Sequence, residues 1–245
     1  MTISQAEAAA AAAPLRVEPN GPAEGGLTEW EAMDPAALAS GTPVQRGHLY
    51  DEDEGLGYSV GVWDCTAFDD RPGPYPVDEY MLLLEGKVIM EMPDGTEITI
   101  EAGEAFIIPK GLTCQWKMPG YVRKVFMILD RPDGAEAANP SLNRVSKPPM
   151  GALGGAGEQT VVVSHTAFLN ADGRMAVTRH DYPQAVTGAQ PATVNRLVTV
   201  LAGGIELDGT AFRPGDTVYL QMGQTHRWRI TEGTRLIEAI FNPGR

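Results

Sequence analysis

The sequence lacks three features that would each point to a class of protein. It has only two cysteines, Cys65 and Cys114, and they stand in separate apolar runs instead of the close spacing of a zinc or redox site. No apolar run approaches the ~20 residues of a membrane span. The N-terminus has no basic residue before Arg16 and no apolar core of a signal peptide. We therefore expect a cytoplasmic protein whose two thiols are reduced and buried.

Basic residues are also scarce in this chain. Its 245 residues include 19 lysines and arginines against 32 aspartates and glutamates, which gives a net charge of −13. A charge of this sign and size repels phosphate backbones and anionic lipid surfaces. Nucleic acids and membranes are therefore poor candidates as partners.

A pattern that occurs twice indicates two similar domains. In the first copy an apolar run ends at Gly86 and a second strand-like run begins after Gly103. The second copy repeats this order at Gly203 and Gly215. In both copies a tryptophan follows the second glycine by thirteen residues, and an arginine follows the tryptophan by seven. Because so many spacings agree, we interpret the chain as a duplicated β-barrel domain.

The remaining patterns divide the chain. Short β-rich runs separated by turns such as Pro-Asp-Gly, with no helical period between them, predict antiparallel barrels. Residues 1–26 are rich in alanine, proline and glycine and predict a flexible N-terminal arm. We assign residues 27–130 to the first barrel and 160–245 to the second. Residues 131–159, rich in proline and glycine, are predicted to be the linker.

The two motifs resemble those of the cupins, whose first motif reads G(X)5HXH(X)3–4E(X)6G and whose second reads G(X)5PXG(X)2H(X)3N. Glu79 followed by six residues and Gly86 matches the end of the first motif. Gly103, Pro109 and Gly111 match the start of the second. The resemblance implies an all-β fold of two tandem cupin barrels, each a double-stranded β-helix or jelly roll.

A second stretch resembles one cupin subfamily in particular. Residues 61–68 read GVWDCTAF, and residues 122–124 read VRK after Trp116. Similar sequences occur in a subfamily that includes relatives of ureidoglycine aminohydrolase. That enzyme's activity would require several inward metal ligands, which this sequence does not supply, so we do not assign it here.

The resemblance implies a divalent metal held by histidines and the motif glutamate, and the first barrel keeps little of this set. Its two motif-one histidine positions fall within residues 72–75, which contain no histidine but end at Tyr75. Cys114 replaces the motif-two histidine, and Glu79 alone is retained. One carboxylate and one thiolate make a weak site. We expect no tightly held metal; the alternative is a weakly bound manganese, iron, nickel or zinc ion.

The second barrel departs from the motif in a complementary way. Arg196 stands at the glutamate position and Gln221 at the motif-two proline, whereas His226 is retained. Arg196, if inward, should have an acidic partner or a carboxylate ligand. His226 is either a proton shuttle or a hydrogen-bonded remnant of a metal site. His180 lies on a strand that could face the second cavity, but strand alternation does not decide its direction.

Three candidates, Glu79 and the two tryptophans, also have open roles. Glu79 in an apolar barrel has either a raised pKa suited to acid or base catalysis, or a salt bridge to Arg123 or Lys124. Trp116 and Trp228 lie two residues after Cys114 and His226, and so on the same strand faces. They either stack on a planar ligand or fill the core.

Two hypotheses about function follow, beside a third possibility of a purely structural role in which side chains close both cavities. In the first, a barrel cavity binds a small polar or anionic organic molecule, with Tyr75, Glu79, Cys114, Trp116, Arg196, His226 and Trp228 as the candidate contacts. In the second, the chain is a catabolic isomerase, lyase or hydrolase that uses Glu79 with Cys114 or His226 as acid and base. A homodimer is an assembly that the cupin resemblance implies, and a monomer whose two barrels pack together would mimic it.

Overall fold

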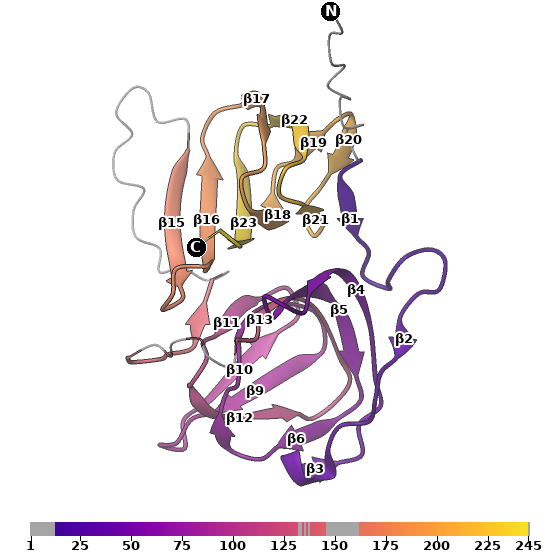
Figure 1. Ribbon diagram of the computed structural model, residues 1–245, viewed down its shortest axis with the longest axis vertical. Coiled ribbons are helices and arrows are strands. Elements are labelled where there is room, and N and C mark those ends of the chain that lie inside the picture. Colours follow the sequence, from indigo (N-terminus) through magenta and orange to yellow (C-terminus); the bar gives the residue numbers. More distant parts are fainter. Residues whose placement is uncertain (1–12, 132–133, 135, 137, 146–161, 245) are drawn as a thin grey trace, which may run out of the picture.

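The computed structural model describes residues 13–131, 134, 136, 138–145 and 162–244. Residues 1–12 of the predicted arm and 146–159 of the predicted linker lie outside the described residues. Figure 1 shows two β-rich lobes stacked along the long axis of the molecule. The described chain forms strands and one short 3-10 helix, Pro35–Ala37, so none of its helices is long enough to cross a membrane. The all-β prediction is confirmed.

The first barrel consists of two facing sheets. The larger has the strand order β14-β11-β8-β13-β5-β4-β2, and the smaller has the order β10-β9-β12-β6-β3 with β7 joined to β12. The strands of this barrel are β2 Thr28–Glu29, β3 Leu38–Gly41, β4 Gln45–Asp53, β5 Tyr58–Cys65, β6 Phe68–Asp70, β7 Gly73–Pro74, β8 Asp78–Glu85, β9 Lys87–Glu91, β10 Glu97–Glu101, β11 Ala105–Ile108, β12 Thr113–Met118, β13 Val122–Leu129 and β14 Asn143–Arg144.

The second barrel repeats this arrangement. Its larger sheet has the order β1-β21-β18-β23-β16-β15, and its smaller sheet the order β17-β22-β19-β20. The central run β11-β8-β13-β5-β4 of the first barrel corresponds to β21-β18-β23-β16-β15 of the second, so the sequence repeat is a repeat of topology. The strands are β1 Leu15–Val17, β15 Val163–Leu169, β16 Met175–Tyr182, β17 Val186–Pro191, β18 Asn195–Ala202, β19 Ile205–Leu207, β20 Thr210–Phe212, β21 Thr217–Leu220, β22 Thr225–Ile230 and β23 Thr234–Phe241.

Backbone conformation and close packing explain why the first shared position of each repeat, residues 86 and 203, is a glycine. Gly86 and Gly203 have positive φ angles of 79° and 70°, which side chains with a Cβ rarely adopt. A Cβ on Gly86 would lie 2.0 Å from the carbonyl oxygen of Tyr121, and one on Gly203 would lie 2.4 Å from Oγ1 of Thr234. Both turns therefore require glycine because the chain crosses close to a neighbouring strand.

Two short strands differ from the predicted organisation. Strand β1 lies within the segment predicted to be a flexible arm, yet it pairs with β21 of the second barrel, with Leu15 opposite Tyr219. Figure 1 shows this strand beside the upper lobe, although the chain that follows it enters the lower lobe. Strand β14 lies within the predicted linker and pairs with β11 of the first barrel. The arm and linker predictions are thus wrong for these residues, because each strand covers an edge that would expose unpaired backbone groups.

An apolar layer joins the two barrels. On β5, the side chains of Tyr58, Val60 and Val62 point out of the first barrel, whereas Trp63 and Cys65 belong to the separate cluster inside it. The outward side chains form one buried cluster with residues of β16, β18, β21 and β23. The barrels are therefore packed face to face through their larger sheets.

The centre of this layer is aromatic and partly polar. The rings of Tyr58 and Phe241, from different barrels, stack with their centroids 4.2 Å apart. The Tyr58 hydroxyl donates to the Tyr219 hydroxyl at 3.2 Å, and the Tyr219 hydroxyl donates to Asp51. Burial raises the pKa of both tyrosines, so each hydroxyl keeps its proton for these bonds.

We predict that Phe241→Ala lowers the free energy of unfolding by about 3–5 kcal/mol, because it opens a cavity in the layer between the barrels. Phe241 is 1% exposed. Urea unfolding measures the change. Leu169→Ala, on β15 of the same sheet but 61% exposed, is the matched control and should change the value by less than about 0.5 kcal/mol. Equal effects of the two substitutions would contradict the packing described.

Candidate functional site

A buried ion pair lies inside the first barrel. Glu79 begins the inward face of β8, and Lys124 projects from the neighbouring strand β13. The Lys124 ammonium donates to Oε1 of Glu79 at 2.7 Å, and the Tyr75 hydroxyl donates to Oε2 of the same carboxylate. Glu79 is 3% exposed and Lys124 8%. Glu79 was expected either to act in acid or base catalysis or to form a salt bridge to Arg123 or Lys124. The structure shows the salt bridge to Lys124.

Aromatic and sulfur groups enclose the ammonium of Lys124. Its Nζ lies 4.7 Å from the ring centroid of Trp63 and 5.0 Å from that of Trp116, close enough for cation–π attraction to both rings. The Met81 Sδ lies 3.3 Å away. An internal cation therefore occupies the position beside Glu79 where the motif would bring a metal ion.

The cysteines do not supply a thiolate. Both are free and buried, as predicted. Burial raises the pKa of Cys114 to about 11, with a further contribution from Asp70, and raises that of Cys65 to about 12. Metal ligation and nucleophilic attack both use the thiolate, which is scarce at neutral pH when the pKa is this high.

A metal does not fit the residues present. In the part of the chain that the structure describes, no three His, Cys, Asp or Glu side chains converge as a possible metal site. The retained motif residue Glu79 is bound by Lys124 and Tyr75, and Cys114 carries a proton at neutral pH. We therefore derive no chemistry from a metal.

Trp116 is buried inside the same barrel and packs with its ring centroid 6.3 Å from that of Phe106. Its indole N–H has no hydrogen-bond partner among the described residues. Trp116 therefore fills the core of the barrel, as one of its two considered roles requires. Its indole N–H is still able to donate to an acceptor atom.

The second barrel contains a second ion pair, with the charges exchanged between strands. Arg196 stands seven residues before Gly203, as Glu79 stands before Gly86, but here the acid is Glu238 on β23. Nη1 of Arg196 donates to Oε1 of Glu238 at 2.8 Å. Nε2 of His180, on β16, lies 3.2 Å from the other carboxylate oxygen. Arg196 thus has the acidic partner that its inward position required.

This second pair is more open than the first. The side chains of Arg196, Glu238 and His180 are 36%, 17% and 19% exposed. Nε of Arg196 is nevertheless buried and has no hydrogen-bond partner among the described residues. Burial raises the pKa of Glu238, but its hydrogen bonds and charge interactions with His180 and Arg196 outweigh this and lower the pKa overall. Glu238 is therefore a carboxylate at neutral pH.

His226 lies on β22 of the opposite sheet and is 3% exposed. Its Nδ1 lies 2.6 Å from Asp208 Oδ2, and its Nε2 lies 3.3 Å from Gln224 Oε1. Asp208 has a positive φ of 49° in the turn between β19 and β20, and its other oxygen accepts from the Arg227 amide at 2.9 Å. With both ring nitrogens engaged, His226 holds this turn, which agrees with a hydrogen-bonded role.

Trp228 and Tyr182 are half-buried and pack against the apolar core of the second barrel. Trp228 has the inward direction predicted from its spacing to His226. Gly188 lies opposite it on β17, where a Cβ would come within 2.4 Å of the indole ring. The absence of a side chain at Gly188 therefore makes room for the tryptophan.

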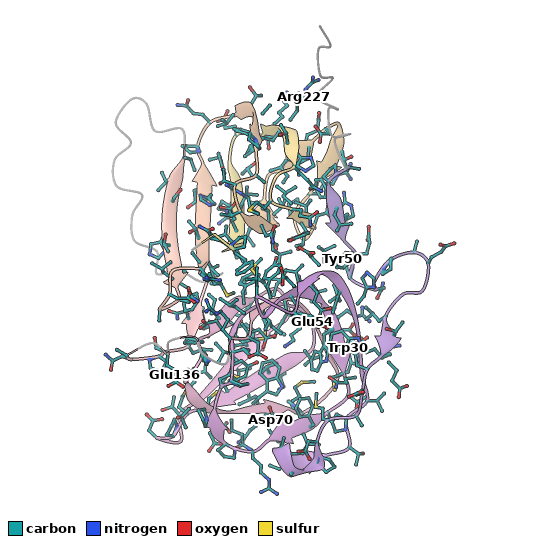
Figure 2. The ribbon with its side chains drawn as sticks, in the orientation of Figure 1. Trp30, Tyr50, Glu54, Asp70, Glu136 and Arg227 are labelled. Carbon is teal, nitrogen blue, oxygen red and sulfur yellow. The ribbon has the colours of Figure 1, made fainter. Side chains whose placement is uncertain are left out.

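A cleft of about 800 Å³ opens on the outer face of the second barrel. Glu206 and Asp208 line it together with Arg227 and Arg229, so its charges balance. Figure 2 places Arg227 at the end of the molecule remote from the first barrel, in which Asp70 lies. The cleft shares Trp228 with the predicted set but not Arg196 or His226.

The structure does not unite the seven predicted residues in one site. Tyr75, Glu79, Cys114 and Trp116 belong to the first barrel, whereas Arg196, His226 and Trp228 belong to the second. Glu79 and His226 therefore cannot act as acid and base on one substrate. The sequence analysis did not identify Glu238. The available signal was its position two residues after Leu236 in an otherwise apolar strand, which places both side chains on the same inward face.

Comparison with known proteins supports the fold. Residues 54–126 match the family described as EutQ-like cupin domains. A protein of unknown function from Pseudomonas syringae pv. tomato, of the DUF861 family, is 16% identical, with a TM-score of 0.66 over 93% of this chain and 98% of its own. A putative dioxygenase from Nostoc punctiforme is 12% identical, with a TM-score of 0.58 over 88% and 79%.

A third similar structure is the cupin 2 conserved barrel domain protein from Leptotrichia buccalis. It is 13% identical, with a TM-score of 0.56 over 84% of this chain and 90% of its own. No protein of curated function matches the sequence. At these identities the likeness concerns the fold alone, and the chain folds as two tandem cupin barrels.

We predict that Lys124→Met lowers the free energy of unfolding by about 3–5 kcal/mol, because it leaves the Glu79 carboxylate buried without its counterion. The double variant Lys124→Met with Glu79→Gln should recover much of this loss. Urea unfolding measures both. Lys117→Met is the control, since Lys117 pairs with Glu97 at 3.1 Å on the outside of the same barrel and should matter little. A double variant as unstable as the single one would refute the pairing argument.

We predict a pH-dependent stability difference at Asp70. Burial raises its pKa to about 6, with Lys124 lowering and Asp69 raising it, against about 3.9 for an unfolded chain. The contribution of Asp70 to the free energy of unfolding is fully present below its pKa in the unfolded chain. It is lost as the pH rises through its higher pKa in the folded protein. Asp70→Asn should therefore gain stability over the wild type between about pH 4 and 7 in urea unfolding.

The control for this measurement is Asp94→Asn. Hydrogen bonds from Thr96 lower the pKa of Asp94. The Asp94→Asn variant should therefore have a lower free energy of unfolding than the wild type, opposite in sign to the change in Asp70→Asn. An Asp70→Asn difference that does not vary with pH would contradict the raised pKa.

Proposed function

We propose that this bicupin binds a small polar or anionic organic molecule inside its second barrel, with Arg196 as the anchor. One observation carries the proposal. The guanidinium of Arg196 is inside the barrel and satisfied on one side by Glu238, yet it keeps a buried Nε without a partner among the described residues and remains 36% exposed. A ligand oxygen that reaches this side would satisfy a donor that is otherwise costly to bury.

The chemistry of the guanidinium supports an oxygen-bearing ligand. Its planar fork of donors matches the two oxygens of a carboxylate, and a carbonyl oxygen fits one arm of the fork. Trp228 and Tyr182 add partly exposed rings that suit a small planar body. Glu238 already neutralises Arg196, so a monoanion fits this site better than a multiply charged one.

The first barrel is a weaker candidate for the same role. Its charges are paired and enclosed by Trp63 and Trp116, with Lys124 only 8% exposed. Its polar groups compensate one another inside the core, which supports a structural role. A ligand there would have to compete with an ion pair and two rings.

We expect a small monocarboxylate to stabilise the wild-type protein against heat. A ligand at 100 times its Kd adds about 2.7 kcal/mol to the unfolding free energy. Glyoxylate, pyruvate and benzoate at millimolar concentration are suitable probes in differential scanning fluorimetry. Arg196→Lys keeps the charge beside Glu238 but loses the planar fork of donors and Nε. The apparent affinity for the carboxylate, taken from the thermal shift, should therefore fall at least about tenfold.

The matched control is Arg235→Lys, which makes the same change at an exposed arginine at the start of β23. It should respond to the carboxylates as the wild type does. Equal ligand-induced shifts in the Arg196→Lys and Arg235→Lys variants would count against the Arg196 site, and no shift with any of the carboxylates would count against anion binding.

A further inference from the structure

A line of hydrogen bonds crosses four strands on the inner face of the second barrel. Ser164 on β15 lies opposite His180 on β16, and its Oγ is 2.8 Å from His180 Nδ1. His180 Nε2 is 3.2 Å from Glu238 Oε2 on β23. Arg196 on β18 binds the other oxygen of Glu238 at 2.8 Å. This line of contacts places a hydroxyl, an imidazole and a carboxylate in the order that nucleophilic serine catalysis uses.

The two hydrogen-bond partners of His180 favour one tautomer of its neutral ring. Glu238 is ionised and can only accept, so the proton on the neutral imidazole lies on Nε2. Nδ1 then has a free lone pair and accepts from the Ser164 hydroxyl. This tautomer is the one in which the imidazole can remove the hydroxyl proton.

Exposure increases along the same line. The Glu238 and His180 side chains are mostly buried, whereas Ser164 is exposed, so the orienting groups are held and the hydroxyl meets solvent. Strand β15 is the last in its sheet among the described strands. Alternate backbone N–H groups of such a strand face away from their only neighbour, so one lies within a residue of Ser164.

We propose that Ser164 is a nucleophile for small esters, with His180 as its general base and Glu238 as a positioning residue. Ser164 Oγ attacks the carbonyl carbon, and its proton passes to Nδ1 of His180. The bond to the alcohol oxygen breaks, and His180 returns the proton to this leaving group. Water then attacks the acyl-serine in the same way, which releases the carboxylic acid and restores the hydroxyl. This activity goes beyond the binding proposed for Arg196 and does not require it.

The test is acylation of the full-length protein by p-nitrophenyl acetate, followed by mass spectrometry of its peptides. We expect an acetyl group on Ser164 and release of p-nitrophenolate. Ser164→Ala should abolish both. Thr166→Ala is the control, since Thr166 lies two residues away on the same strand and contacts Thr178, and it should react as the wild type does. Because Ser164 and Thr166 are exposed, both variants should fold, which circular dichroism checks.

His180→Gln separates a catalytic contact from a structural one. A general base contributes about 10²–10⁴-fold, so acetylation of Ser164 should slow by at least about 100-fold in this variant. Acetylation at an unchanged rate would overturn the proposal. So would the absence of any adduct on Ser164 of the wild type with both p-nitrophenyl acetate and a fluorophosphonate, which needs no acyl-binding pocket.

Glu238→Gln tests the positioning residue through a spectroscopic signature. The chain has four histidines, so the ¹⁵N shifts of the His180 ring can be assigned by substitution. In the wild type we expect the proton on Nε2; in the variant we expect the Nδ1-protonated tautomer and slower acetylation. An unchanged tautomer would overturn the role of Glu238. A protein that acetylates Ser164 but ignores carboxylates would retain this inference and lose the binding proposal.

Discussion

The large sheets of the two barrels turn one face toward each other, and the apolar layer between them fixes which side chains point into each barrel. Along β5 and β23 the residues alternate between this layer and the barrel interior. A slip of one residue would move every apolar side chain to the wrong face, so the register is strongly specified. Glu79, Lys124 and Arg196 face inward for this reason, and their burial follows from the layer.

Charge compensation is the second constraint. Each barrel encloses an acid and a cation on two neighbouring strands, but Glu79 faces Lys124 in the first barrel and Arg196 faces Glu238 in the second. In both orientations the buried charge of one strand is compensated by the neighbouring strand, which avoids the cost of an unpaired charge inside the barrel. The two interiors differ in access, because rings enclose the first pair whereas the second is partly exposed.

Local spacing predicted the features that depend on local structure. The antiparallel barrels and the shared strand face of Cys114 and Trp116 follow from turn chemistry and strand alternation within one repeat. The cupin arrangement of the strands and the inward direction of that face were implied by the family resemblance. The contacts of the second barrel depend instead on register between distant strands. Ser164 meets His180, and His180 meets Glu238, across 16 and 58 residues of sequence. No period in the sequence specifies such a contact, so Ser164 and Glu238 were missed although His180 was considered.

Strand β1 also has a consequence for the order in which the molecule is made. It leaves the ribosome before any of the first barrel, but its partner β21 follows about 200 residues later. At synthesis rates of roughly 5–20 residues per second, β1 waits on the order of ten to forty seconds for that partner. The first barrel can complete its sheets during this interval, whereas the larger sheet of the second barrel cannot gain β1 as its edge strand until β21 has been made. The second barrel thus closes one edge with a strand that precedes the whole first barrel in the sequence.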